Sequence, residues 1–101
     1  MQRKETTSEK DTVVRDEARC SDGITYHYRL TVHESGHVSA YRLPLYSVSA
    51  EMCFPGEETP SRAELRDCFS DAGKAIVFFD KVVEHLATPI DLRYIMEDEM
   101  S

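Results

Sequence analysis

Long apolar segments and clusters of basic residues are both missing from this chain of 101 residues. No apolar run approaches the roughly 18 residues that a membrane span requires, so we expect no membrane-spanning segment. Residues 1–10 are mostly polar and lack the apolar segment of a secretory signal, which favours a cytoplasmic location. The net charge of −7, without a run of Lys or Arg, argues against nucleic acid or an anionic membrane as a partner, because binding a polyanion needs a basic surface.

Paired cysteine motifs and catalytic motifs are missing as well. Cys20, Cys53 and Cys68 are odd in number and widely spaced, and none forms a C-x-x-C pair. In a reducing compartment such residues behave as small hydrophobic side chains. The chain has no Gly-rich phosphate loop and no nucleophile elbow. We therefore predict no catalytic residue and no cofactor, and the sequence favours a non-enzymatic protein.

The composition that is present belongs to an ordinary globular domain, with 41% hydrophobic and 31% charged residues. A chain of this length can bury a modest core without a disulfide or a metal. Residues 1–11 carry mixed charges and almost no apolar side chain, so we expect a mobile tail there. Residues 12–101 are then expected to form a single domain.

Alternating residues and turn signals predict antiparallel strands in the first half. A weak strand over residues 12–20 is followed by Asp22-Gly23, a strong hairpin signal. Residues 24–34 form the clearest strand, because apolar and polar residues alternate with period 2.

A second turn is predicted at Ser35-Gly36, with the third strand running on from His37. A two-residue turn pairs Leu30 with Tyr41 and matches apolar residues across one face of the sheet. The apolar set then changes phase at Pro44, where we expect a bulge or an edge.

The C-terminal half predicts a helical cover for this sheet. After a loop over residues 53–61, residues 64–69 fit either a fourth strand or the start of one long helix. The N-cap residue Ser70 and the early Gly73 favour the strand. An apolar stripe with three- and four-residue spacing predicts a helix over residues 71–87.

A second, short and acidic helix is predicted over residues 89–99. Pro89 suits the first helical position, and Thr88 would cap the helix, with Asp91 completing a capping box. The predicted fold class is α+β, a three- to four-stranded antiparallel meander with the long helix on one face and the short helix at one end. The predicted core consists of Tyr28, Leu30, Val32, Leu43, Ile76, Phe79, Val83, Leu86 and Ile95.

Two motifs in the C-terminal third carry a resemblance to a known family: Asp67-Cys68-Phe69-Ser70-Asp71, and Thr88-Pro89-Ile90-Asp91-Leu92 followed by Ile95-Met96-Glu97-Asp98. They resemble a family of small uncharacterised clostridial proteins, a domain of unknown function with a Tyr-rich hairpin, a helix, Pro-x-x-Leu and an acidic C-terminal helix. Asp91 stands where that pattern has His, and Glu99-Met100 where it has an apolar pair. The resemblance implies a similar fold and a bacterial source, and it implies no activity.

Histidines supply the candidate metal ligands. The string from His33 to His37 reads H-E-x-x-H, the zinc-protease motif, whose two imidazoles converge only when the string is helical. Here it spans a predicted turn between strands, so we interpret it as a chance match. His27, Arg29 and His33 share the polar face of the clearest strand. That face could bind a metal or an anion, but the pattern favours an ordinary solvated sheet face.

Candidate interface residues lie in the two helices. Glu97, Asp98 and Glu99 concentrate negative charge. This favours a solvated helix end or a docking patch for a basic partner over a catalytic or metal site, because consecutive helical residues point in different directions. Phe78 flanks the helical stripe and is interpreted as surplus to the core. The leading hypothesis is a small cytoplasmic interaction or regulatory module that binds a protein partner or forms a homodimer. The alternative is a small-ligand or metal-binding protein, or a small enzyme, using the His27 and His33 face.

Overall fold

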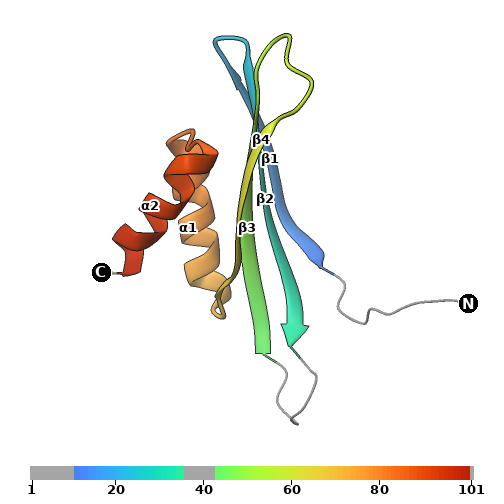
Figure 1. Cartoon of the computed structure of the whole chain (residues 1–101). Coiled ribbons are helices and arrows are strands. Elements are labelled where there is room, and N and C mark those ends of the chain that lie inside the picture. The colour runs from blue at the N-terminus through green and yellow to red at the C-terminus, as the bar shows by residue number, and fades with distance from the viewer. Residues whose placement is uncertain (1–10, 36–42, 101) are drawn as a thin grey trace, which may run out of the picture.

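The computed structural model describes residues 11–35 and 43–100. Within these residues four strands precede two helices: β1 (Thr12–Ser21), β2 (Ile24–Ser35), β3 (Leu43–Cys53), β4 (Ser61–Phe69), α1 (Ala72–Glu84) and α2 (Pro89–Met100). The strands form one antiparallel sheet in the order β1-β2-β3-β4, and both helices lie on the same face of it (Figure 1). The α+β meander predicted from the sequence is confirmed, including the fourth strand.

The first hairpin follows directly from its turn residues. Asp22 and Gly23 both have positive φ, 54° and 79°, as a two-residue turn between twisted strands requires. Ser21 and Ile24 close the pairing of β1 with β2 at this turn. The predicted hairpin is confirmed, whereas the predicted tail lies outside the described residues except for Asp11.

The predicted register between β2 and β3 is wrong. Leu30 pairs with Val48 rather than with Tyr41, and the described part of β3 is Leu43–Cys53. The observed register places four apolar pairs on the face below the helices, from Val32–Tyr46 to Tyr26–Met52, where the predicted one offered three. Burying the larger apolar set favours the observed pairing. His37 and Tyr41 lie outside the described residues.

In the described strands, bulges occur at two places other than Pro44. In β1 one extra residue is inserted between Val13 and Arg15, and in β4 residues 66–68 stand opposite Ser47 alone. Pro44 pairs with Glu34 of β2 without a register shift. It precedes the first β3 residue that pairs with β4, so it occupies the edge position where a proline is tolerated.

Helix α1 begins and ends one to three residues inside its predicted limits. Its N-cap is Asp71 rather than Ser70, because the extended Asp71 accepts a hydrogen bond at 2.9 Å from the Lys74 N–H. The helix ends where Leu86 turns into the left-handed region, with φ of 49°. The Ala87 N–H donates to the Val82 carbonyl at 3.1 Å, which closes a Schellman-type end.

Helix α2 starts with the predicted capping box. The Asp91 N–H donates to Thr88 Oγ1 at 3.2 Å, and the Thr88 N–H donates to Asp91 Oδ2 at 3.3 Å. Pro89 occupies the first helical position, where its missing N–H costs nothing. Among the described residues no helix is both long and apolar enough to span a membrane.

The core lies between the helices and the two central strands. The Tyr28 hydroxyl donates to the Ala87 carbonyl at 2.8 Å and so ties β2 to the junction of the helices. Leu43, predicted to be buried, is 56% exposed, because it stands at the start of β3. Leu86 is half-buried at the helix end. The buried apolar residues are Tyr28, Leu30, Val48, Ala50, Ala75, Phe78, Phe79, Val82, Val83, Ala87 and Leu92.

Candidate functional site

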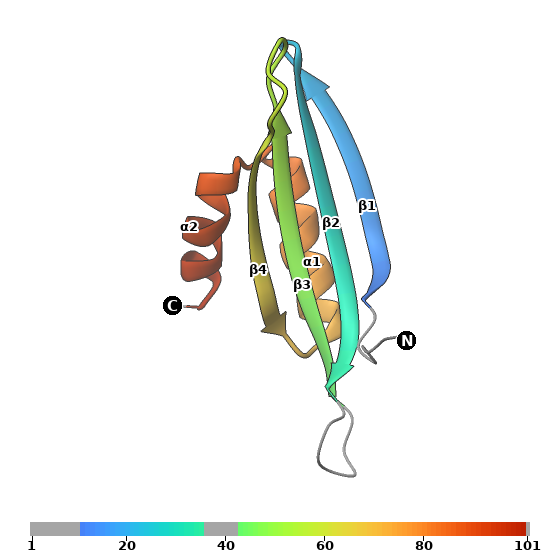
Figure 2. The same cartoon turned by 45° about the vertical axis from the view of Figure 1, so that its right-hand side comes forward.

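One face of the sheet carries neither helix, and we call it the open face (Figure 2). On it His27 Nε2 donates to Asp16 Oδ1 at 2.5 Å, and Arg29 Nε lies 3.3 Å from Asp16 Oδ2. The hydrogen bond from His27, with the charges of His27 and Arg29, lowers the pKa of Asp16. His27 Nδ1 also lies 3.9 Å from Glu51. His27 is thus held between two carboxylates from neighbouring strands.

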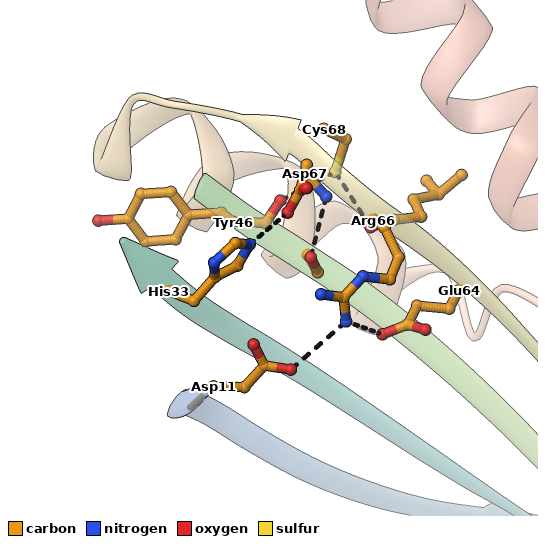
Figure 3. A network of polar contacts seen from close by, with 9 residues as sticks. Asp11, His33, Tyr46, Glu64, Arg66, Asp67 and Cys68 are labelled. Atoms are coloured by element: carbon orange, nitrogen blue, oxygen red, sulfur yellow. Dashed lines mark hydrogen bonds and ion pairs between the residues drawn. The ribbon is translucent and has the colours of Figure 1, made fainter. Parts of the chain in front are cut away.

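The second histidine of the open face reaches the β4 bulge. His33 is buried, and its Nε2 donates to Asp67 Oδ1 at 2.8 Å (Figure 3). Asp67 has φ of 53°, and its backbone N–H donates to the buried Ser47 hydroxyl at 2.9 Å. Asp tolerates this left-handed conformation better than most residues. The hydrogen bonds of Asp67 therefore fix the bulge and hold the His33 ring in place.

Arginine and cysteine side chains complete the polar network around the bulge. Arg66 Nη1 lies 3.4 Å from both Asp11 and Glu64, and the hydrogen bond to Asp11 raises the pKa of Arg66 (Figure 3). Cys68 Sγ lies 3.5 Å from the Tyr46 carbonyl, and burial raises the pKa of this thiol to about 11. A thiol with so high a pKa is a poor nucleophile at neutral pH. The contacts of this network join the β4 bulge to His33 of β2, to β3 and to Asp11 before β1.

The two histidines of the open face do not converge on one point. His27 and His33 are six residues apart on β2, which corresponds to about 20 Å along a strand. His33 Nδ1 is buried without a hydrogen-bond partner, yet the described residues contain no group of three or more His, Cys, Asp or Glu side chains placed to hold a metal. His37, the third candidate, lies outside the described residues.

A shallow groove separates α2 from β4, and we call it the α2–β4 groove. Its volume is about 400 Å³. On its helical side lie Ile90 and Tyr94, which are 74% and 65% exposed, although both are large and apolar. The lining residues are Ala63, Glu64 and Leu65 of β4 with Pro89, Ile90, Leu92, Arg93, Tyr94 and Glu97 of α2. The groove combines an apolar helix stripe with the outer strand of a sheet.

The predicted interface residues fall into different environments. Phe78 is buried, with its ring centroid 5.3 Å from that of Phe69, so the interpretation that it is surplus to the core is wrong. β4 supplies Phe69 as a packing partner on that side of α1, which widens the buried arc of the helix. Glu97 is exposed and lines the α2–β4 groove. Asp98 and Glu99 belong to α2, and their side chains lie outside the described ones.

Sequence reasoning missed Ile90 and Tyr94. The signal was available, because these residues are four apart in a helix whose buried side is marked by Leu92 and Ile95. A short helix with apolar residues on two opposite sides carries more apolar surface than packing on one side can bury.

Comparisons with protein-family models, with curated proteins and with solved structures find no match for this chain. The resemblance to the small clostridial family stays a prediction.

Proposed function

We propose that this protein is a small cytoplasmic interaction module that binds another protein chain through the α2–β4 groove. The observation that carries the proposal is the exposed pair Ile90 and Tyr94 on one side of α2. Exposed apolar residues that gather beside a groove are typical of protein interaction sites. Glu97 at the same groove adds a negative charge that suits a basic group on the partner.

The internal packing of α2 supports this assignment. Leu92 is fully buried and anchors the helix to the sheet, while the Thr88 cap fixes its first turn. The largely exposed Ile90 and Tyr94 therefore contribute less than Leu92 to holding the helix in place. Aromatic residues such as Tyr are also enriched at the centres of interfaces. The alternative, ligand or metal binding on the open face, has less support, because His27 and His33 lie far apart and each already pairs with a carboxylate.

Capture experiments with matched variants test the proposal. The full chain, Ile90→Ser/Tyr94→Ser, and Val77→Ser would each be immobilised and exposed to lysate of the native host and to a differently tagged copy of the chain. Val77 is the matched control, because it is 61% exposed on α1 and does not line the groove. We expect saturable capture of one protein, or of the second copy, by the wild type and by Val77→Ser. Capture by Ile90→Ser/Tyr94→Ser should fall at least tenfold. Equal capture by all three chains would contradict the proposed function.

A further inference from the structure

The outer strand β4 offers a free edge beside the α2–β4 groove. Within the described residues β4 pairs only with β3, and the stretch from Ser61 to Leu65 keeps a regular register. The bulge at residues 66–68 ends that stretch. An edge strand presents unpaired N–H and C=O groups and can accept a further strand. The outward-pointing backbone groups of this stretch are therefore geometrically ready to pair.

We infer that the chain forms a two-fold homodimer in which the β4 edges of two copies pair antiparallel about Ala63. This inference rests on the proposed function and names the partner of the α2–β4 groove as a second copy of the chain. In a two-fold interface the same patch of both copies must be complementary to itself. The residues of β4 meet that condition in one register.

Charge selects the register centred on Ala63. There Arg62 lies opposite Glu64 of the second copy, and Glu64 lies opposite Arg62 of the second copy, so two pairs of opposite charge form across the edge. Moving the pairing by two residues either way places Glu64 opposite Glu64 or Arg62 opposite Arg62, and like charges directly opposite are destabilising. Moving it by one residue puts the two open faces on opposite sides of the joint sheet.

The charged side chains needed for this pairing are accessible. Arg62 is exposed, and in the part of the chain that the structure describes it makes no ion pair. Glu64 is exposed as well. Its Oε2 lies 3.4 Å from Arg66 Nη1, which is a long and solvated ion pair. Both side chains belong to the open face, since Arg62 pairs with Glu51 and Glu64 with Ser49 of β3.

The helices supply the apolar part of the same interface. A register centred on Ala63 keeps α2 of both copies on the same side of an eight-stranded sheet, beside the joint edge. Ile90 and Tyr94 line the groove at that edge, so pairing of the edges would bring the two stripes together and remove them from water. One arrangement thus accounts for the exposed apolar pair and for the alternating charges of β4.

The opposite edge of the sheet shows why β4 is preferred. β1 carries a similar string, Glu17-Ala18-Arg19, but Arg19 Nη1 already contacts Glu17 Oε1 at 2.9 Å. The groove beside β1 is bordered on α1 by Asp80 and Glu84 rather than by exposed apolar residues. A β1-centred dimer would bring acidic residues together. Arg19→Glu is therefore a matched control for a charge reversal on β4.

Charge reversal and mixing test the inference in sedimentation velocity and light scattering of the full chain. We expect the wild type and Arg19→Glu to be dimers. Arg62→Glu and Glu64→Arg should each be monomeric, with a dissociation constant raised at least tenfold. An equimolar mixture of Arg62→Glu and Glu64→Arg should restore a dimer, because each places its charges opposite their complement. Circular dichroism and thermal unfolding verify that the variants are folded.

The outcomes separate this inference from the proposed function. A monomeric wild type overturns the inference, yet the proposed function stands if the chain captures a different protein and loses it in Ile90→Ser/Tyr94→Ser. A dimer that survives both charge reversals but dissociates in that double variant overturns the β4 register alone. A monomer that captures nothing through the groove overturns both.

Discussion

The two helices of this protein use their apolar residues in opposite ways. α1 buries Phe78, Phe79, Val82 and Val83 against the sheet and leaves Val77 as its exposed large apolar residue. α2 fully buries Leu92, while Ile90 and Tyr94 face solvent. In Figure 1 both helices lie on one face of the sheet, but α1 packs on β2, β3 and β4, and α2 packs mainly on β4 and β3 at the sheet edge.

This difference separates the residues that hold the fold from those that can change without unfolding it. Apolar side chains buried in α1 contribute to the free energy of folding directly. Ile90 and Tyr94 lie on the outer side of α2, which faces away from the buried Leu92. They contribute little to the free energy of folding while they remain in water. Substitutions in α1 should therefore change stability, and those on the outer side of α2 should change association.

Phe79→Ala should have the largest effect on stability. The ring is fully buried between α1 and the sheet, so its removal leaves a cavity as well as losing apolar contact. We expect the free energy of unfolding to fall by about 3–5 kcal/mol, measured by urea denaturation. Val77→Ala on the same helix is the control and should stay within about 0.5 kcal/mol. Similar losses in both variants would refute the division between the two sides of α1.

The contrast between the helices was only partly readable from the sequence. The hairpin at Asp22-Gly23 and the Thr88–Asp91 capping box were predictable because each depends on residues close in the chain. The stripe of α1 was predictable in outline. The exact set of buried residues on α1 was not predictable, because Phe78 is covered by Phe69 from β4, a residue of another element.

The register between β2 and β3 depends on contacts between residues that are far apart in the chain. Leu30 could be matched with Tyr41 or with Val48 on the basis of alternation alone. The apolar area that the helices cover decides between them, and a local turn signal at Ser35-Gly36 carries no information about it. The same limit applies to the candidate site. Exposure of Ile90 and Tyr94 is known only once the packing of Leu92 is known.

A substitution at the junction of the two helices should have the next largest effect on stability. Tyr28→Phe removes the hydroxyl that donates to the Ala87 carbonyl and leaves that buried acceptor unpaired. We expect a loss of about 1–3 kcal/mol at pH 7 in chemical denaturation. Tyr94→Phe, which removes an exposed hydroxyl on α2, should leave stability unchanged. A loss of equal size in Tyr94→Phe would show that α2 is held from its outer side.

The same variant has a pH signature. Burial raises the pKa of Tyr28 to about 12 in the folded protein, above the ordinary value of 10.0. As the pH rises above 10 the unfolded chain loses this proton first, so the stabilising contribution is intact below pH 10 and is lost between pH 10 and 12. Tyr28→Phe should therefore lose stability less steeply in that window than its parent. Cys68 adds a comparable loss from pH 9 to 11, so both chains are compared in a Cys68→Ala background.

The helix caps should give smaller and unequal effects. Asp71→Ala and Thr88→Ala each remove an N-cap acceptor, which costs about 1 kcal/mol in a helix whose formation is coupled to folding. Because α1 forms the core, the Asp71 loss should appear in global unfolding. The Thr88 loss in global unfolding should be smaller, because the first turn of α2 can fray while Leu92 stays packed, and it should also appear as faster hydrogen exchange in that turn. Equal losses in global unfolding would mean that α2 folds as cooperatively as α1.

The smallest effect is expected at the end of α1, where two contributions oppose each other. Leu86 has φ of 49°, a conformation that favours glycine, so Leu86→Gly relieves backbone strain of about 1 kcal/mol. The same change removes a half-buried side chain and makes the unfolded chain more flexible. We expect a net change within about 1 kcal/mol in urea denaturation, whereas Leu92→Ala on α2 should cost about 2–5 kcal/mol. If Leu86→Gly costs as much as Leu92→Ala, Leu86 packs as a core residue, and the core of α1 extends past its last turn.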